Sequence, residues 1–345
     1  MAKTRIKSPL VDMLGIDYPI IQGGMAPFST ANLAAAVSNA GGMGTVSIPR
    51  GGNPEVIEHL HRVKRATDRN FAMNTVIGSR SYSEEGLIQG GEDTIDTVIR
   101  EKEKDPDLRD RLVLYITSGG DPSAVHQRIK DAGFLHFHMV ASLRHAKKVE
   151  ELGVDGIMAA GYEMGGHTHR ADRTTHTFVL VPSAARAVSV PVCATGGVCD
   201  GATFAAALAL GAAGVYMGTR FIATQECDFH EQYKEAIVGA AEHGTVVIPS
   251  LLGPARHLNT PFTNAVLEAE ERMVRGELSQ GEKTQMVTAA HTLAQETGDY
   301  DQGLFMSGMC SSRVESIPTV KDLIDSMVDD AAEIINDMHS DLIES

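Results

Sequence analysis

The chain has 345 residues, of which 43% are hydrophobic and 22% are charged, and its formal net charge is −15 with a pI near 5.3. These values are typical of a globular protein with a large core. They argue against binding to nucleic acid or to an anionic membrane surface. The four cysteines form no CxxC pair, and neither a signal peptide nor an apolar run of about 18 residues occurs. We therefore expect a cytoplasmic protein without a membrane span.

Short apolar segments rich in β-forming residues recur along the chain and predict eight strands. They lie at residues 19–22, 44–48, 71–77, 112–117, 134–140, 155–160, 191–195 and 213–219. They are continuous apolar runs, which is typical of parallel strands buried on both faces.

Helical patterns fill the gaps between these strands. They lie at residues 29–42, 54–67, 121–133, 142–153 and 200–211, and four of the five end in Gly shortly before the next strand. Repeated strand–helix units predict an α/β protein with a parallel sheet, and eight units favour a closed (β/α)8 TIM barrel over a doubly wound sheet.

Two regions depart from this repeat. Residues 80–110 are charged and predict a helical excursion, and residues 228–300 predict an added helical segment after strand eight. We assign residues 1–227 and 301–345 to the barrel. Residues 228–300 are then either a helical insertion, or lid, near the barrel mouth or an ordinary peripheral helical layer. Residues 318–342 predict a terminal amphipathic helix.

Active sites of such barrels lie at the C-terminal ends of the strands, and phosphate sites usually lie after strands seven and eight. Gly196 and Gly197 follow strand seven, and Gly218 and Thr219 follow strand eight. Glycines let backbone N–H groups approach an anion, although they also occur in plain turns. Because both loops carry the signal, we favour phosphate binding.

Three other strand ends carry polar or flexible residues. Met25 follows strand one and Asn74 lies inside strand three, where each also has an ordinary core explanation. After strand six, a glycine-rich loop carries His167, which is the strongest candidate for acid/base chemistry. A loop histidine without a task is the plain alternative. His167 and His169 match no known closed metal site, so we expect no metal.

Several stretches together resemble the nitronate monooxygenase family, also called 2-nitropropane dioxygenase-like proteins. They read YPIIQGGMA from residue 18, AAAVSNAGGMGTVS from residue 34, GYEMGGHTH from residue 161, VPVCATGGVCDGATFAAALALGAAGVYMGTRFIATQE from residue 190 and GLFMSGM from residue 303. The resemblance covers residues 8–240 and 303–325. It implies an FMN-dependent barrel oxidoreductase, in a family that includes flavin enoyl-acyl-carrier-protein reductases and NAD(P)H:quinone reductases.

The resemblance also implies site residues. It places the isoalloxazine ring near Gly24, Met25, Asn74, Gly161, Gly165 and Gly166. It places the FMN phosphate, and the segment that closes over the cofactor, at Gly196, Gly197, Gly218, Thr219, Ser307 and Gly308. His167 is the implied base or proton donor. The chain departs from the family at Gly24, where many relatives have Pro or Ala, at His169, and in residues 228–300.

The first functional hypothesis is oxidation of a small alkyl nitronate with oxygen, with His167 deprotonating the neutral nitroalkane. The alternative is an NAD(P)H-dependent flavin reductase of an enoyl thioester or a quinone, in which His167 protonates the product. A third hypothesis, a non-catalytic flavin-binding protein, has no need of a placed base at His167. The partner is a small-molecule substrate in the first two cases, and NAD(P)H and a homodimer are left open.

Overall fold

The computed structural model describes residues 4–25, 30–47, 53–77, 85–169, 174–250 and 253–342. The parts of the predictions that fall on residues 26–29, 48 and 80–84 lie outside these ranges. All eight predicted strands are present and form one parallel sheet in the order β1-β9-β8-β6-β5-β4-β3-β2. Their bounds are β1 Ile20–Gln22, β2 Gly44–Ser47, β3 Phe71–Val76, β4 Leu112–Ser118, β5 Leu135–Val140, β6 Gly156–Ala160, β8 Val192–Thr195 and β9 Gly214–Met217.

The first and last strands of this order, β1 and β2, close the barrel through a short seam. Ile21 forms an isolated parallel bridge with Met43. Beyond that bridge the buried Gln22 side chain takes over the pairing. Its amide nitrogen donates to the Thr45 carbonyl (3.0 Å), and its amide oxygen accepts from the Thr45 N–H (3.2 Å). A buried amide with both groups satisfied therefore replaces a missing rung of the strand ladder.

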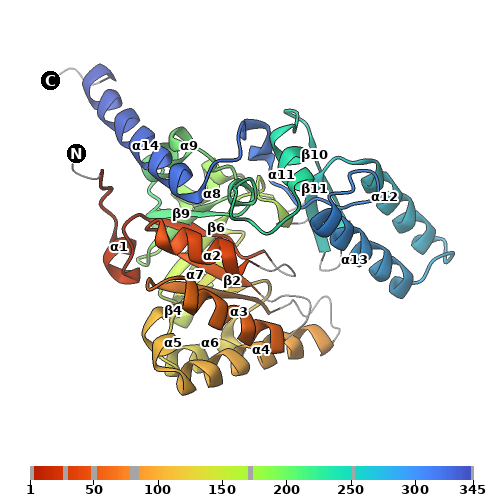
Figure 1. Ribbon diagram of the computed structural model, residues 1–345, viewed down its shortest axis with the longest axis horizontal. Helices are drawn as coiled ribbons and strands as arrows, with labels where there is room; N and C mark the ends of the chain where they lie inside the picture. The colour runs from red at the N-terminus through yellow and green to blue at the C-terminus, as the bar shows by residue number, and fades with distance from the viewer. Residues whose placement is uncertain are drawn as a thin grey trace.

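Helices surround the sheet and confirm the predicted (β/α)8 repeat (Figure 1). They are α1 Pro9–Leu14, α2 Ala31–Asn39, α3 Asn53–Ala66, α4 Glu85–Lys104, α5 Pro106–Arg111, α6 Ser123–Asp131, α7 Leu143–Leu152, α8 Thr177–Ala187, α9 Gly201–Ala209, α10 Thr219–Ile222 and α14 Val320–Leu342. The charged excursion is α4 with α5, and the amphipathic C-terminal helix is α14. None of the described helices is long and apolar enough to cross a membrane.

The barrel interior is a packed core and not a pore. Inward-facing side chains from the strands fill it, with Met43 contributing just before β2, and α1 adds Leu10 and Leu14 from the N-terminal side. The Ser8 hydroxyl caps the first turn of α1 by accepting the Leu10 N–H at 3.1 Å. This packing leaves the C-terminal ends of the strands as the place for a cavity.

The segment after strand eight contains the expected helices and, in addition, a β-hairpin that the sequence pattern did not predict. The helices are α11 Glu231–Val238, α12 Pro261–Val274 and α13 Gln280–Thr297, and the hairpin strands are β10 Thr245–Ser250 and β11 Gly253–Leu258. The hairpin joins the short strand β7 Gly166–His167 in a second, three-stranded sheet. Ile248, Val266, Val287, Ala290 and Leu304 form a separate small core there, and Figure 1 shows this part beside the barrel.

Candidate active site

A cavity of about 360 Å³ opens where the strands of the barrel end. Its volume falls within the usual range for small-molecule and cofactor sites. Most of the residues proposed from the sequence line it: Gly24, Met25, Asn74, Gly165, Gly166, His167, Gly196, Gly197, Gly218, Thr219 and Gly308. The fold thus brings together loops that are far apart in the chain.

Gly161 and Ser307 lie behind this lining and do not form part of it. The Gly161 N–H donates to the Thr195 carbonyl at 2.9 Å, and a Cβ at Gly161 would collide with the Thr177 hydroxyl. Ser307 is fully buried, and its N–H donates to the Arg256 carbonyl at 3.3 Å. These two residues support the neighbouring loops.

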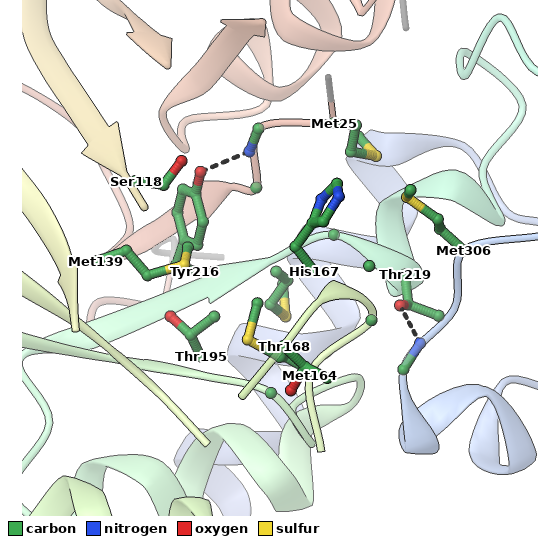
Figure 2. Close-up of a pocket in the computed structure, with 18 of the residues that line it drawn as sticks. Met25, Ser118, Met139, Met164, His167, Thr168, Thr195, Tyr216, Thr219 and Met306 are labelled. Atoms are coloured by element: carbon green, nitrogen blue, oxygen red, sulfur yellow. Dashed lines mark hydrogen bonds between the residues drawn. The ribbon is translucent and has the colours of Figure 1, made fainter. Parts of the chain in front are cut away.

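His167 is presented by the second sheet. It forms strand β7 with Gly166, and β7 pairs antiparallel with β11 so that His167 lies opposite Ala255. The next residue continues the contact, because the Thr168 N–H donates to the Pro254 carbonyl at 2.9 Å. In Figure 2 the His167 imidazole points toward Met25, with Met306 to its right. The base candidate is therefore held on a paired strand and not on a free loop.

The His167 imidazole is electrically neutral at physiological pH. Burial lowers its pKa from 6.5 to about 4, because a low-dielectric site disfavours the charged ring. Its Nε2 atom is buried and has no hydrogen-bond partner within the described part of the chain. His169 differs, since its Nε2–H donates to the Ala160 carbonyl at 2.7 Å. His167 is thus the one of the two whose Nε2 is left for a ligand.

Glu163, which the sequence argument did not single out, ties this loop to two other segments. Its carboxylate accepts from the Thr177 N–H (3.0 Å) and the Thr177 hydroxyl (3.0 Å). Its carbonyl accepts from the Met309 N–H at 2.9 Å. The loop is also pressed against the C-terminal segment at Gly165, where a Cβ would lie 2.5 Å from the Gly308 nitrogen.

The loop after β8 has the geometry of an anion cradle. Gly196 and Gly197 have φ values of 90° and 84°, which glycine adopts without strain. A Cβ at Gly196 would lie 2.8 Å from the Met164 nitrogen. The N–H groups of Gly196 and Gly197 donate to no oxygen of the described residues. Nearby, the Thr219 hydroxyl accepts the Gly308 N–H at 2.9 Å (Figure 2).

These features fit FMN. Buried polar atoms that have no partner among the described residues, Thr195 Oγ1, Ser307 Oγ and His167 Nε2, belong to three of the segments that build the site. Free backbone N–H groups at Gly196 and Gly197 suit a phosphate. The cavity continues from these glycines to the Met25 and Asn74 end, which is lined partly by apolar side chains. The groups present match both an anion and a flat ring.

The structure adds lining residues that the sequence argument missed. Among them are Ser118, Gly119, Gly120, Met139, His145, Met164, Thr168, Tyr216, Ile222, Phe229, Tyr233 and Met306. The position of Tyr216 was readable from the sequence, because it is a phenol inside the apolar run of strand eight. Phe229 and Tyr233 come from the segment after strand eight, and their place in the cavity depends on its tertiary packing.

The fold and the cavity together define an FMN-dependent barrel oxidoreductase. Comparison with known proteins agrees. The family described as "Nitronate monooxygenase" matches residues 7–330. A probable nitronate monooxygenase of Staphylococcus aureus (strain MSSA476) is 31% identical over 297 residues, which cover 76% of this chain and 81% of that protein. The chain belongs to the nitronate monooxygenase family.

Two further relatives match over nearly the whole chain. A (3aS,4S,5R,7aS)-5-hydroxy-7a-methyl-1-oxo-octahydro-1H-indene-4-carboxyl-CoA dehydrogenase of Rhodococcus jostii (strain RHA1) is 29% identical and covers 96% of this chain and 97% of its own. The solved structure of FabK from Thermotoga maritima is 33% identical with a TM-score of 0.85, covering 97% and 99% of the two chains. The similarity therefore extends through most of residues 228–300, so the departure from the family that we expected for this region is wrong.

Proposed function

We propose that the protein oxidises small alkyl nitronates, which it also generates from neutral nitroalkanes. The observation that carries this proposal is the neutral, unpartnered Nε2 of His167 in the cavity. A neutral imidazole is a base, and it can remove the proton from the carbon next to a nitro group. The family membership supports a nitro substrate.

Bound FMN would accept the electrons of the substrate and pass them to oxygen. Gly196, Gly197, Gly218 and Thr219 would hold its phosphate, and Met25 and Asn74 would contact its ring. Gly161, Gly165 and Gly166 would shape the ring edge, and Ser307 and Gly308 would close over it. The paired strand β7 would orient His167, because its backbone is fixed by Ala255.

We also propose that residues 228–300 act as a lid. Phe229, which precedes α11, and Tyr233, on α11, line the cavity. The Tyr233 hydroxyl donates to the Met306 carbonyl at 3.0 Å and so ties α11 to the C-terminal segment. Apolar side chains at this point would exclude water from the reacting atoms.

A second candidate is NAD(P)H-dependent reduction of an enoyl thioester or a quinone, with His167 returning a proton to the product. One observation favours a thioester. The Rhodococcus relative, which is named for a carboxyl-CoA substrate, aligns over 96% of this chain and so includes most of the proposed lid. The alignment with the Staphylococcus relative covers a smaller share of this chain, 76%.

An anaerobic visible spectrum of the FMN-loaded protein separates the two candidates. Bleaching of the flavin by a small alkyl nitronate, but not by NADH or NADPH, supports nitronate oxidation. Rapid bleaching by a nicotinamide alone moves the protein to the reductase candidate.

The variant His167→Ala tests the base directly. Turnover of a neutral nitroalkane should fall about 100- to 10,000-fold, with little loss of FMN. Turnover of the preformed nitronate should fall much less, because its proton is already gone. Equal losses with both substrates would contradict the assigned role, and unchanged turnover would remove it.

A further inference from the structure

Three consecutive main-chain N–H groups after β1 are engaged inside the protein. Gly23 donates to the Met217 carbonyl at 2.6 Å. Gly24 donates to the Tyr216 hydroxyl at 2.6 Å, the bond drawn in Figure 2. Met25 donates to the Ser47 hydroxyl at 2.7 Å. A ligand can take one of these N–H groups only by breaking an existing hydrogen bond, so this loop offers a ligand no free N–H group.

Asn74 likewise has its donor group engaged and its acceptor group free. Its amide nitrogen donates to the Ile116 carbonyl at 3.2 Å and lies 3.5 Å from the Ser118 hydroxyl. The amide oxygen is left as an acceptor on a side chain that is 3% exposed. It lies against Gly24, where a Cβ would collide with it. The Asn74 amide oxygen is thus a free acceptor at an end of the cavity where the main-chain N–H groups are already engaged, and we call this the acceptor end.

The other end of the cavity has the opposite polarity. The N–H groups of Gly196 and Gly197 are free within the described residues, and they suit the anionic end of a ligand. The cavity therefore has a donor end and an acceptor end. A ligand must present hydrogen-bond acceptors at the first and hydrogen-bond donors at the second, in addition to fitting the shape of the cavity.

The three N–H groups after β1 have different acceptors. The Met217 carbonyl belongs to the main chain, whereas the Tyr216 and Ser47 hydroxyls belong to side chains that a substitution can remove. Tyr216 lies 4% exposed on β9 and lines the cavity. Its hydroxyl takes the middle N–H of the loop, that of Gly24, whose missing Cβ makes room for Asn74. If this hydroxyl were absent, the Gly24 N–H would become a donor at the acceptor end.

We propose that Tyr216 is a positioning residue for the flavin ring: by occupying the Gly24 N–H, it makes the ring end of the cavity accept hydrogen bonds. Such a surface favours a ring that presents N–H groups, as the imide edge of a flavin does. This inference depends on FMN binding and not on the substrate proposed above.

The test uses the whole chain with FMN and needs no substrate. For Tyr216→Phe, we expect the Kd of oxidised FMN to rise about tenfold. We also expect the midpoint potential of the bound flavin to change, because the ring then meets a free Gly24 N–H in place of an engaged one. FMN fluorescence titration and spectroelectrochemistry measure the two quantities.

Tyr115→Phe is the matched control. Tyr115 is also a buried tyrosine on a barrel strand. Its hydroxyl forms a 2.7 Å hydrogen bond with the Thr75 hydroxyl, and neither residue lines the cavity. It should change thermal stability without changing FMN affinity or potential. Equal FMN affinities and potentials for the two variants would overturn the proposal.

Ser47→Ala keeps the proposal testable if Tyr216→Phe does not fold. It frees the Met25 N–H in the same way, and it should shift the potential in the same direction. A folded Ser47→Ala protein with the wild-type potential would overturn the proposal. A wild-type protein that binds no FMN would instead remove the cofactor assignment, whatever its substrate.

Discussion

His167 and Ala255 lie opposite each other across strands β7 and β11, so the imidazole that faces the cavity is fixed by a hairpin from much later in the chain. The barrel alone would leave this residue on a glycine-rich loop. Pairing with β11 converts two loop residues into a strand and gives the side chain one direction.

The acid limit of the reaction should reflect the buried state of His167. Burial lowers the pKa of His167 from 6.5 to about 4. The imidazole therefore keeps its neutral, basic form as the pH falls through 6.5, and it becomes protonated only as the pH approaches 4. The measurement is kcat/KM for a neutral nitroalkane as a function of pH, with FMN fluorescence as a control for intact structure. An acid limb centred at 6.5 would show that His167 is not the group that titrates.

Arg256 should affect turnover more than stability. It is 5% exposed, and its guanidinium donates to the Tyr162 carbonyl at 3.0 Å and to the Thr245 hydroxyl at 3.2 Å. The guanidinium also lies 4.7 Å over the Tyr162 ring. In Arg256→Met the packing is largely kept and the cost of burying a charge disappears. The histidine loop loses its anchor, so kcat should fall about 10- to 100-fold with a nearly unchanged melting temperature.

Arg256→Lys controls for charge in this experiment. It keeps the cation but loses the planar fork, so it should give an intermediate kcat. A wild-type kcat in both variants would exclude a positioning role for Arg256.

Gly165→Ala should weaken FMN binding. The new Cβ would lie 2.5 Å from the Gly308 nitrogen and 2.6 Å from the Ser307 carbonyl carbon, and neither backbone atom can rotate away. Separating these segments costs about 1–3 kcal/mol in similar overpacked sites, or about 5- to 150-fold in affinity. Fluorescence titration with FMN measures the change.

Gly281→Ala is the corresponding neutral site. Gly281 lies in α13, and the nearest atom to an added Cβ is the Ser279 hydroxyl at 4.0 Å. Because alanine is the better helix former, this variant should gain about 0.5–1 kcal/mol of stability and keep its FMN affinity. A loss of affinity equal to that of Gly165→Ala would mean that the cavity argument is wrong.

A buried chain of neutral groups behind β4 and β5 should make the protein sensitive to acid. Thr117 bonds to both His136 and His138 at 2.7 Å, and His136 contacts His126 at 2.8 Å. Burial, with a smaller contribution from His126, lowers the pKa of His136 to about 3. Below pH 6.5 the His136 side chain binds a proton in the unfolded chain but stays neutral in the folded protein. The free energy of unfolding therefore decreases as the pH is lowered from 6.5 to about 3.

The size of this effect follows from the linkage relation. Near pH 5, His136 alone should reduce the free energy of unfolding by about 2 kcal/mol. Urea denaturation at neutral and acid pH, with excess FMN present, measures it. In His136→Gln the dependence on pH should be shallower by about that amount, even if the variant is less stable at neutral pH. An unchanged slope would assign the acid sensitivity to other groups.

The barrel was predictable because each of its strands is a continuous apolar run and most of these runs are followed by a helical pattern. The hairpin was not, since Pro249 and Pro254 interrupt the pattern of β10 and β11, and proline argues against a paired strand. The helix α8 was also not predicted, because Pro182 lies inside it. In both cases tertiary packing overrides the local signal.

The candidate site divides in the same way. His167 and the glycines were visible because they follow predicted strands, where barrel sites lie. Tyr216 carried a readable signal, a hydroxyl inside an apolar run, similar to that of Asn74. Arg256 carried none, because its importance comes from pairing with Gly166 across the second sheet. Sequence patterns locate strand ends, but they do not reveal which distant segment covers them.

The two halves of the cavity have separate supports: Gly196 and Gly197 follow a barrel strand, whereas His167 belongs to the second sheet, whose hairpin strands precede α12. Changes in the hairpin therefore act first on the imidazole, whereas the glycine loop is held by its own barrel strand. During divergence, such a protein can acquire a new reaction without first having to rebuild its hold on the cofactor. For engineering, the hairpin is the natural place for a focused library.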